Sequence, residues 1–174
     1  GMVCTSQPLA AGAGLDVLKR GGNAIDAAVA TAACMTVTEP TSNGIGSDAF
    51  ALVWIEKEKK LYGLNASGKA PMAVDPQIIR DMGYSEMPIT GWHTVMVPGA
   101  PSAWAEMARR FGKLPLTDSF QAAIGYAEDG YPLSPVISKL WEKEYNRLNK
   151  ELQDPRVQAH SDGFRELFRV FMPH

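Results

Sequence analysis

Two glycine-bounded segments carry the residue types that most readily bind a ligand. The first is Gly-Ile-Gly-Ser-Asp-Ala at residues 44–49, and the second is Gly-Leu-Asn-Ala-Ser-Gly-Lys at residues 63–69. Glycine-rich loops let a backbone approach phosphate or carboxylate groups closely. The side chains on offer are the carboxylate of Asp48, the hydroxyl of Ser67 and the ammonium group of Lys69.

The first segment has the spacing of a dinucleotide-binding fingerprint, but its surroundings are wrong. That chemistry requires a strand, then a turn, then a helix whose N-terminus meets the pyrophosphate. The residues around 44–49 predict a helix before the loop and a strand after it. We therefore reject a dinucleotide site. Asp48 either lines a binding site or caps its own loop through a local side-chain hydrogen bond, and we favour the cap.

The second segment is one residue short of a phosphate-binding P-loop. Lys69 stands at the position of the phosphate-binding lysine, but Ala70 replaces the hydroxyl residue that would hold Mg²⁺. Pro71 and Pro76 oppose the long helix that should follow. A nucleotide binder at residues 63–69 is kept as a minor alternative.

The helices and strands that position these loops are predicted from the spacing of apolar residues and from the Pro, Gly and Asn residues that begin or end them. Pro8 begins a helix that Gly21-Gly22 ends, and Asn23 caps an apolar, alanine-rich helix running to about Thr38. The apolar run 49–55 predicts a buried strand, and residues 60–64 predict its hairpin partner.

Helices dominate the second half of the sequence. Pro101, Leu116 and Ser134-Pro135 each begin an amphipathic pattern, and a last one contains Phe164, Leu167, Phe168 and Phe171. Further short strands are predicted at 2–6 and 93–97, which gives three or four in all. So small a sheet leaves bare edges, so we expect more strands from sequence outside this chain or from a partner.

The composition excludes several classes of function. The 174 residues are 45% hydrophobic and carry a net charge of −2, with no basic run, so no nucleic-acid partner is expected. The longest apolar stretch, 27–37, is too short and polar to cross a membrane. No signal peptide is visible, and the compartment stays open between cytoplasmic and exported.

Neither a metal nor a cofactor is expected. Cys4 and Cys34 have no metal or redox spacing, and both are predicted to be small buried thiols. The three histidines, His93, His160 and His174, are scattered along the chain, and we expect each to be structural or solvated.

Five sequence blocks, taken in order, resemble the γ-glutamyltransferase family. They are GMVCTSQPLAAGAGLDVLKRGGNAIDAAVATA, EPTSNGIGSDAFALV, LNASGKAP, VPGAPSAWAEMARRFGKLP and AAIGYAEDGYPLS. Together they cover nearly all of the chain to about residue 136. One block could arise by chance, but five in series identify the chain as similar to the N-terminal part of that family's large subunit.

The resemblance implies an α/β fold, the N-terminal portion of a four-layer αββα sandwich of the N-terminal-nucleophile hydrolases, with a helix-rich C-terminal half. Residues 1–174 would form one partial domain. Family members cleave their own precursor, and the freed N-terminal Thr of the smaller subunit attacks a γ-glutamyl or related acyl amide, with its own α-amine as base. That Thr would lie beyond residue 174, so this chain has no catalytic residue of its own and is expected to be inactive without the Thr-led partner subunit.

One substrate contact of the family falls within this chain. Where well-studied transpeptidases carry an Arg that grips the α-carboxylate of the glutamyl donor, this sequence has Ser67, and a cation returns two residues later as Lys69. Ser67 and Lys69 are thus the candidate substrate-binding residues, with a solvated loop lysine as the alternative for Lys69. The change favours a looser glutamyl preference. Asn65-Ala-Ser67 also spells a glycosylation acceptor, a triplet that is common by chance.

Two functions from different classes follow. The first is an acyltransferase or amidohydrolase of which this chain is the N-terminal segment. The second is a non-catalytic binding or assembly module that keeps the same half-fold.

Overall fold

The computed structural model describes residues 1–89, 91–155 and 161–171, mostly as helices with one two-stranded sheet. The contacts divide the chain into two compact units. The first contains residues 1–71 and 96–132, and the second contains residues 72–95 and 133–174. Each unit is described by itself below.

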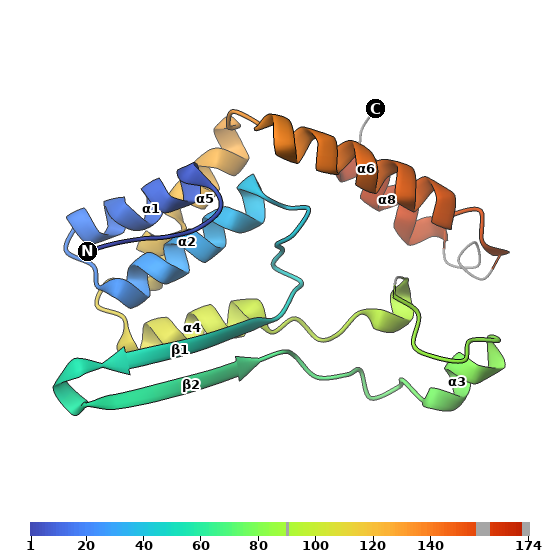
Figure 1. The fold of residues 1–174 in the computed structure, drawn as a ribbon, viewed down its shortest axis with the longest axis horizontal. Helices are drawn as coiled ribbons and strands as arrows, with labels where there is room; N and C mark the ends of the chain where they lie inside the picture. Colours follow the sequence, from blue (N-terminus) through green and yellow to red (C-terminus); the bar gives the residue numbers. More distant parts are fainter. Residues whose placement is uncertain (90, 156–160, 172–174) are drawn as a thin grey trace. The chain divides into compact units, whose positions relative to one another are not determined.

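The first unit is built on three packed helices. They are α1 (Pro8–Lys19), α2 (Ala24–Thr38) and α5 (Leu116–Asp129), and α2 lies against both of the others (Figure 1). The predicted start of α1 and both predicted ends of α2 are confirmed. Small side chains allow the close approach, and Gly14 is the clearest case, since a Cβ there would lie 2.4 Å from Thr31 Oγ1.

A buried carboxylate joins the start of α2 to the segment that precedes α5. Asp26 is 1% exposed and accepts hydrogen bonds from the backbone N–H groups of Asn23 at 2.8 Å, Lys113 at 3.0 Å and Leu114 at 3.3 Å. The Asn23 side-chain amide donates to the Phe111 carbonyl at 2.6 Å. Backbone donors thus satisfy a charge that burial would otherwise make costly.

The sheet is an antiparallel hairpin of β1 (Ala49–Ile55) and β2 (Lys60–Ala66), joined by a 3₁₀ turn, η1 (Glu56–Glu58). Its start and pairing confirm the predicted hairpin. Helix α4 (Ala100–Phe111) lies along the hairpin on the side of α2 (Figure 1). The Tyr62 and Phe111 rings meet at 5.0 Å, and the Arg110 guanidinium lies 4.6 Å from the Tyr62 ring.

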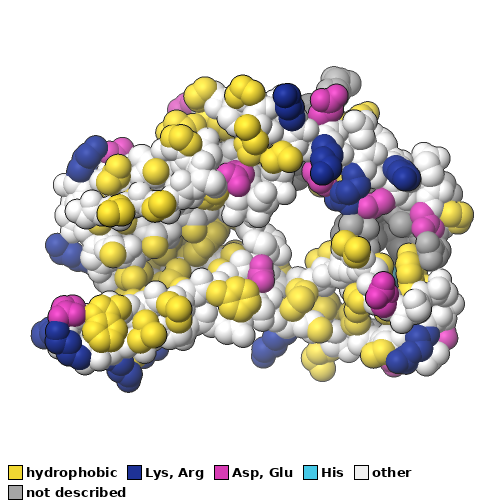
Figure 2. Space-filling view, in the orientation of Figure 1, with side chains coloured by type: hydrophobic (Ala, Val, Ile, Leu, Met, Phe, Trp, Pro, Cys, Tyr) yellow, Lys and Arg dark blue, Asp and Glu magenta, His cyan; other side chains and the backbone are white. Residues whose placement is uncertain are grey.

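The two faces of the hairpin differ sharply. Val53, which faces the helices, is 7% exposed, whereas its neighbour Leu52 is 77% exposed, and Phe50, Trp54 and Leu61 are also exposed. Figure 2 shows hydrophobic side chains gathered along the hairpin, with lysines at its turn. The prediction that 49–55 is a buried strand was right about the strand and wrong about its burial, because no second layer covers this face among the described residues.

The second unit contains α3 (Pro76–Asp81), η2 (Trp92–Thr94), α6 (Pro135–Glu151) and α8 (Ser161–Phe171). The predicted cap of α6 is confirmed, since Ser134 Oγ accepts from the Ile137 N–H at 3.2 Å. The last amphipathic helix is confirmed as well, and the rings of Tyr145 and Phe168 meet at 5.6 Å. The side chains of Phe164 and Phe171, and all of His160 and His174, lie outside the described residues.

Two of the predicted strands are wrong. Residues 2–6 are coil, and residues 93–97 contain part of η2 followed by coil. Both segments have strand-like composition, but neither has a neighbouring strand edge to pair with in the part of the chain that the structure describes. The observed sheet therefore has two strands rather than three or four.

The cysteines differ from each other. Cys34 is buried as predicted, but Cys4 is exposed, because the coil that carries it leaves one side open. Burial raises the pKa of the Cys34 thiol, and a side-chain hydrogen bond with Thr38 lowers it in part. Among the described residues no helix is long and apolar enough to cross a membrane.

Candidate functional site

Three loops meet at one end of the hairpin. The pairing of Ala49 with Ala66 places the loop that enters β1 beside the loop that leaves β2. The third loop precedes α4, and it joins both of the others through its backbone. The N–H groups of Gly99 and Ala100 donate to the Ser47 carbonyl at 3.1 and 2.9 Å, and the Val97 N–H donates to the Lys69 carbonyl at 2.9 Å.

Two glycines make this junction as tight as backbone packing allows. A Cβ on Gly68 would lie 2.0 Å from the Val97 carbonyl oxygen, and a Cβ on Gly99 would lie 1.9 Å from the Ala66 carbonyl oxygen. Gly68 also has a φ of +80°, which side-chain-bearing residues rarely adopt. We call residues 44–48, 66–69 and 97–100 the loop junction.

Ser67 and Lys69, the candidate substrate-binding residues, both belong to this junction. The Ser67 N–H donates to Asn65 Oδ1 at 3.0 Å, and its partly buried hydroxyl reaches the Gly68 carbonyl only at 3.4 Å. The Lys69 side chain is exposed and forms no ion pair with any described residue. The junction therefore fixes the two backbones and leaves both polar groups available to a ligand.

Ser47, and not Asp48, makes the local hydrogen bond that was expected to cap the loop. Ser47 makes the local cap, because its hydroxyl donates to the Gly44 carbonyl at 2.5 Å. The Asp48 carboxylate is exposed, and within the described ranges it has no hydrogen bond and no ion pair. Sequence reasoning missed this outcome, since either of two adjacent polar residues could have closed the loop.

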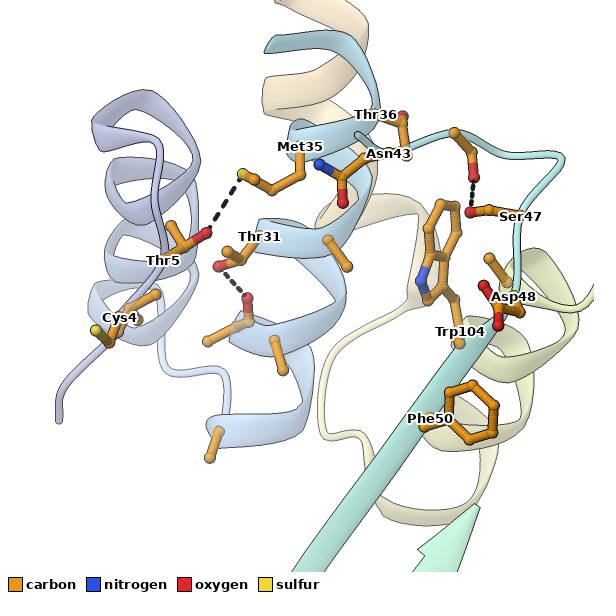
Figure 3. A pocket seen from close by; sticks show the side chains of 18 of the residues that line it. Cys4, Thr5, Thr31, Met35, Thr36, Asn43, Ser47, Asp48, Phe50 and Trp104 are labelled. Carbon is orange, nitrogen blue, oxygen red and sulfur yellow. Dashed lines mark hydrogen bonds between the residues drawn. The ribbon is translucent and has the colours of Figure 1, made fainter. Parts of the chain in front are cut away.

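Asp48 lies on the wall of a groove in the first unit. This groove, of about 570 Å³, is lined by residues 1–5, one side of α2, the loop before β1, and the rings of Phe50 and Trp104. Figure 3 shows Asp48, Phe50 and Trp104 at the same end of the groove, with Thr5 bonded to Met35 at the far end. Ser67 and Lys69 do not line it.

The nucleotide-binding alternative at residues 63–69 lacks its structural context. The chain after Lys69 is irregular as far as Asp75, and α3 is only six residues long. A P-loop needs a helix directly after the lysine, so that the helix N-terminus faces the phosphates. The expectation that Pro71 and Pro76 prevent a long helix here is confirmed.

The loop at 97–100 is the part of the site that sequence reasoning did not find. It was predicted as the end of a strand and the start of a helix, with no link to residues 66–69. Its one signal was Gly99 between Pro98 and the helix, which in retrospect marks a close approach of two backbones.

The gamma-glutamyltranspeptidase family pattern matches residues 10–174. The "Glutathione hydrolase-like YwrD proenzyme" of Bacillus subtilis is 36% identical over 148 residues, which cover 84% of this chain and 28% of that protein. The "Acylase ACY 1 proenzyme" of a Pseudomonas strain is 38% identical over 146 residues, covering 79% of this chain and 26% of that protein.

A solved structure gives the same picture. The cephalosporin acylase from Bacillus halodurans is 56% identical, with a TM-score of 0.81, over 93% of this chain and 30% of that one. This chain therefore spans between a quarter and a third of the length of these three proteins.

Proposed function

Because this chain belongs to the gamma-glutamyltranspeptidase family, we propose that it is the N-terminal segment of an acyl-transfer enzyme that acts on γ-glutamyl or related acyl amides. The nucleophile is a Thr outside residues 1–174, freed by cleavage of a precursor, with its own α-amine as general base. The acyl group passes to that Thr and then to water or an amino acid.

The exposed face of the hairpin is the observation that carries the proposal beyond family membership. Phe50, Leu52 and Trp54 expose their side chains on one face, and apolar faces of this size are normally covered. We assign that cover to the Thr-led part of the same precursor, whose strands would complete a four-layer αββα sandwich. The two-stranded sheet seen here would then be one edge of a larger sheet.

The loop junction supplies the contacts to the acyl group in this proposal. Ser67 offers a hydroxyl and Lys69 a point charge where a bidentate guanidinium would select a glutamyl carboxylate more strictly. A relative named glutathione hydrolase-like is 36% identical to this chain, and two relatives named acylase are 38% and 56% identical. A donor range wider than γ-glutamyl amides is consistent with both names.

The direct test uses the full-length protein that contains this chain. We expect a denaturing gel to show two fragments, with a Thr at the N-terminus of the smaller one. We also expect the protein to release p-nitroaniline from γ-glutamyl- or glutaryl-p-nitroanilide. A reading frame that ends at His174 without a Thr-led partner gene would contradict the proposal and favour a non-catalytic binding module.

Lys69→Ala in that protein tests the site. We expect it to raise the KM for carboxylate-bearing donors by about tenfold, since a hydrogen bond to a charged group is worth about 1.5 kcal/mol or more. Lys113→Ala is the matched control, because Lys113 is an exposed lysine that follows α4 and lies outside the loop junction. An unchanged kcat/KM in Lys69→Ala would show that Lys69 is a solvated bystander.

A further inference from the structure

Asn43 is the one asparagine in the sequence that is followed by a glycine. An asparagine side chain can react with its own main chain, because the next backbone nitrogen is able to attack the amide carbon, Cγ. A glycine in the next position favours this attack, since it has no Cβ to obstruct it and its backbone turns freely. Asn43 and Gly44 lie in the irregular segment between α2 and β1, and both are half-buried.

The attacking nitrogen is free to react in this structure. The Gly44 N–H donates no hydrogen bond to any residue in the described ranges. A helix or a strand would occupy that N–H and would hold the preceding ψ at values that keep the side chain away from it. The hydrogen bond from the Asn43 N–H to the Glu39 carbonyl, at 3.1 Å, fixes the residue before the reactive peptide bond and not the bond itself.

The amide under attack is lightly held and open to water. Its one hydrogen bond to a described residue runs from Asn43 Nδ2 to the Glu39 carbonyl, at 3.3 Å. Asn43 and Gly44 both line the groove described above, and Figure 3 shows the Asn43 amide on its wall. A groove of about 570 Å³ holds many water molecules, so water reaches the amide carbon.

We propose that Asn43–Gly44 is a site of spontaneous covalent modification. The Gly44 nitrogen forms a bond to Asn43 Cγ, the Cγ–Nδ2 bond breaks, and the amide nitrogen leaves as ammonia with the proton of the Gly44 N–H. Water then opens the succinimide ring that has formed. Breakage of the bond from nitrogen to Cγ leaves an aspartate at position 43. Breakage of the bond from nitrogen to the backbone carbonyl carbon leaves an isoaspartate, in which the main chain runs through the former side chain.

Both products loosen the loop junction. A carboxylate at position 43 cannot donate to the Glu39 carbonyl, and its charge lies at the C-terminal end of α2, where the helix dipole is also negative. Isoaspartate, in addition, lengthens the main chain directly before Gly44. The Gly44 carbonyl accepts the bond from Ser47 that closes the loop, and the Ser47 carbonyl accepts two N–H groups from the start of α4.

Ageing of the full-length protein at mildly alkaline pH tests the proposal. Peptide mass spectrometry reports loss of each amide, and methyl transfer by an isoaspartyl methyltransferase reports isoaspartate. We expect both signals at Asn43. Asn23 and Asn65 are internal controls that should keep their amides, because alanine follows each of them. The Asn23 amide also donates to the Phe111 carbonyl at 2.6 Å, and Asn65 lies within the paired strand β2.

Two glycine variants separate the chemistry from the fold. Gly44→Ala should slow the loss of the Asn43 amide by about tenfold, because a Cβ crowds the attacking nitrogen and restricts its backbone. The fold tolerates this change, since the nearest atom to that Cβ would lie 3.9 Å away. Gly46→Ala meets nothing within 4 Å and should age like the wild-type protein. An equal rate in Gly44→Ala and wild type, or an Asn43 amide as durable as that of Asn65, would overturn the proposal.

Hydrogen exchange tests the effect on the loop junction and does not depend on any enzymatic activity. The N–H groups of Gly99 and Ala100, which donate to the Ser47 carbonyl, should exchange faster in the aged protein than in the fresh protein. Asn43→Gln should show no such change, because its longer side chain would have to close a larger ring. Unchanged exchange in a sample whose residue 43 is fully converted would show that the modification does not loosen the junction.

Discussion

The helices of the first unit and its hairpin both carry many apolar side chains, but these side chains end in different states. The α1–α2–α5 packing buries its small side chains within this stretch of chain, and even the charge of Asp26 is satisfied there. The hairpin covers one face with α4 and leaves the other to solvent. Hydrophobicity therefore tells which surfaces must be covered, but not whether the covering residues lie in the same stretch.

The largest expected effect on stability is in the α1–α2–α5 helices, whose apolar surfaces are covered within this chain. Asp26→Ala leaves three backbone N–H groups without an acceptor, and at about 1–3 kcal/mol each this should cost about 4 kcal/mol of unfolding free energy. Urea unfolding of the full-length protein measures it. Asp16→Ala is the control, since Asp16 is exposed and, among the residues that the structure describes, its carboxylate pairs only with Lys19. A loss below about 1 kcal/mol would mean that the junction of α2 with the α4–α5 loop is not a stability determinant.

A substitution in the loop junction should destabilise the protein nearly as much as Asp26→Ala. Gly99→Ala places a Cβ 1.9 Å from the Ala66 carbonyl oxygen, so one of the two backbones must move. We expect this movement to lower the free energy of unfolding by about 3 kcal/mol. The same variant should also alter KM for the acyl donor, because Ser67 and Lys69 move with the displaced backbone. Gly12→Ala, which meets nothing within 4 Å, is the matched control and should not destabilise. If Gly99→Ala had the stability and the KM of the wild-type protein, the close backbone approach at Gly99 would not be what positions Ser67 and Lys69.

The hairpin gives the most direct test of the comparison. Val53→Ser on the covered face should cost about 2 kcal/mol through lost burial. Leu52→Ser changes the adjacent residue on the exposed face. If the rest of the protein covers that face, Leu52→Ser should cost about as much as Val53→Ser in the full-length protein; if that face stays in solvent, its effect should remain within about 0.5 kcal/mol.

The smallest expected effect concerns the cysteines and depends on pH. Burial raises the pKa of Cys34 above that of an unfolded thiol, so its contribution to stability is present below the unfolded pKa and is lost as pH rises through the folded pKa. Cys34→Ser should therefore flatten the alkaline end of the stability curve. Thiol labelling at pH 8 should modify Cys4 first, and equal labelling rates would show that Cys34 is accessible.

Local signals predicted most of the helices and the hairpin. Pro8, Asn23, Ser134 and the run at 49–55 mark element starts that depend on neighbouring residues, and these were placed correctly. The strands at 2–6 and 93–97 were not, because a strand requires a partner edge that composition does not reveal. Half of the candidate site followed from sequence comparison through Ser67 and Lys69. The loop at 97–100 could not be predicted, because it is placed by hydrogen bonds to Ser47 and Lys69, whose backbones are distant in the chain.

The bond between Asp26 and Lys113 has a consequence for synthesis as well as for stability. The two residues are 87 positions apart. At about 5–20 residues per second, a ribosome needs roughly 4 to 17 s to make the intervening chain. During that interval α1 and α2 have emerged, but the helix that covers the other side of α2 does not yet exist. Until α5 has been synthesised, the alanine-rich surface of α2 therefore stays uncovered in the nascent protein and is open to aggregation.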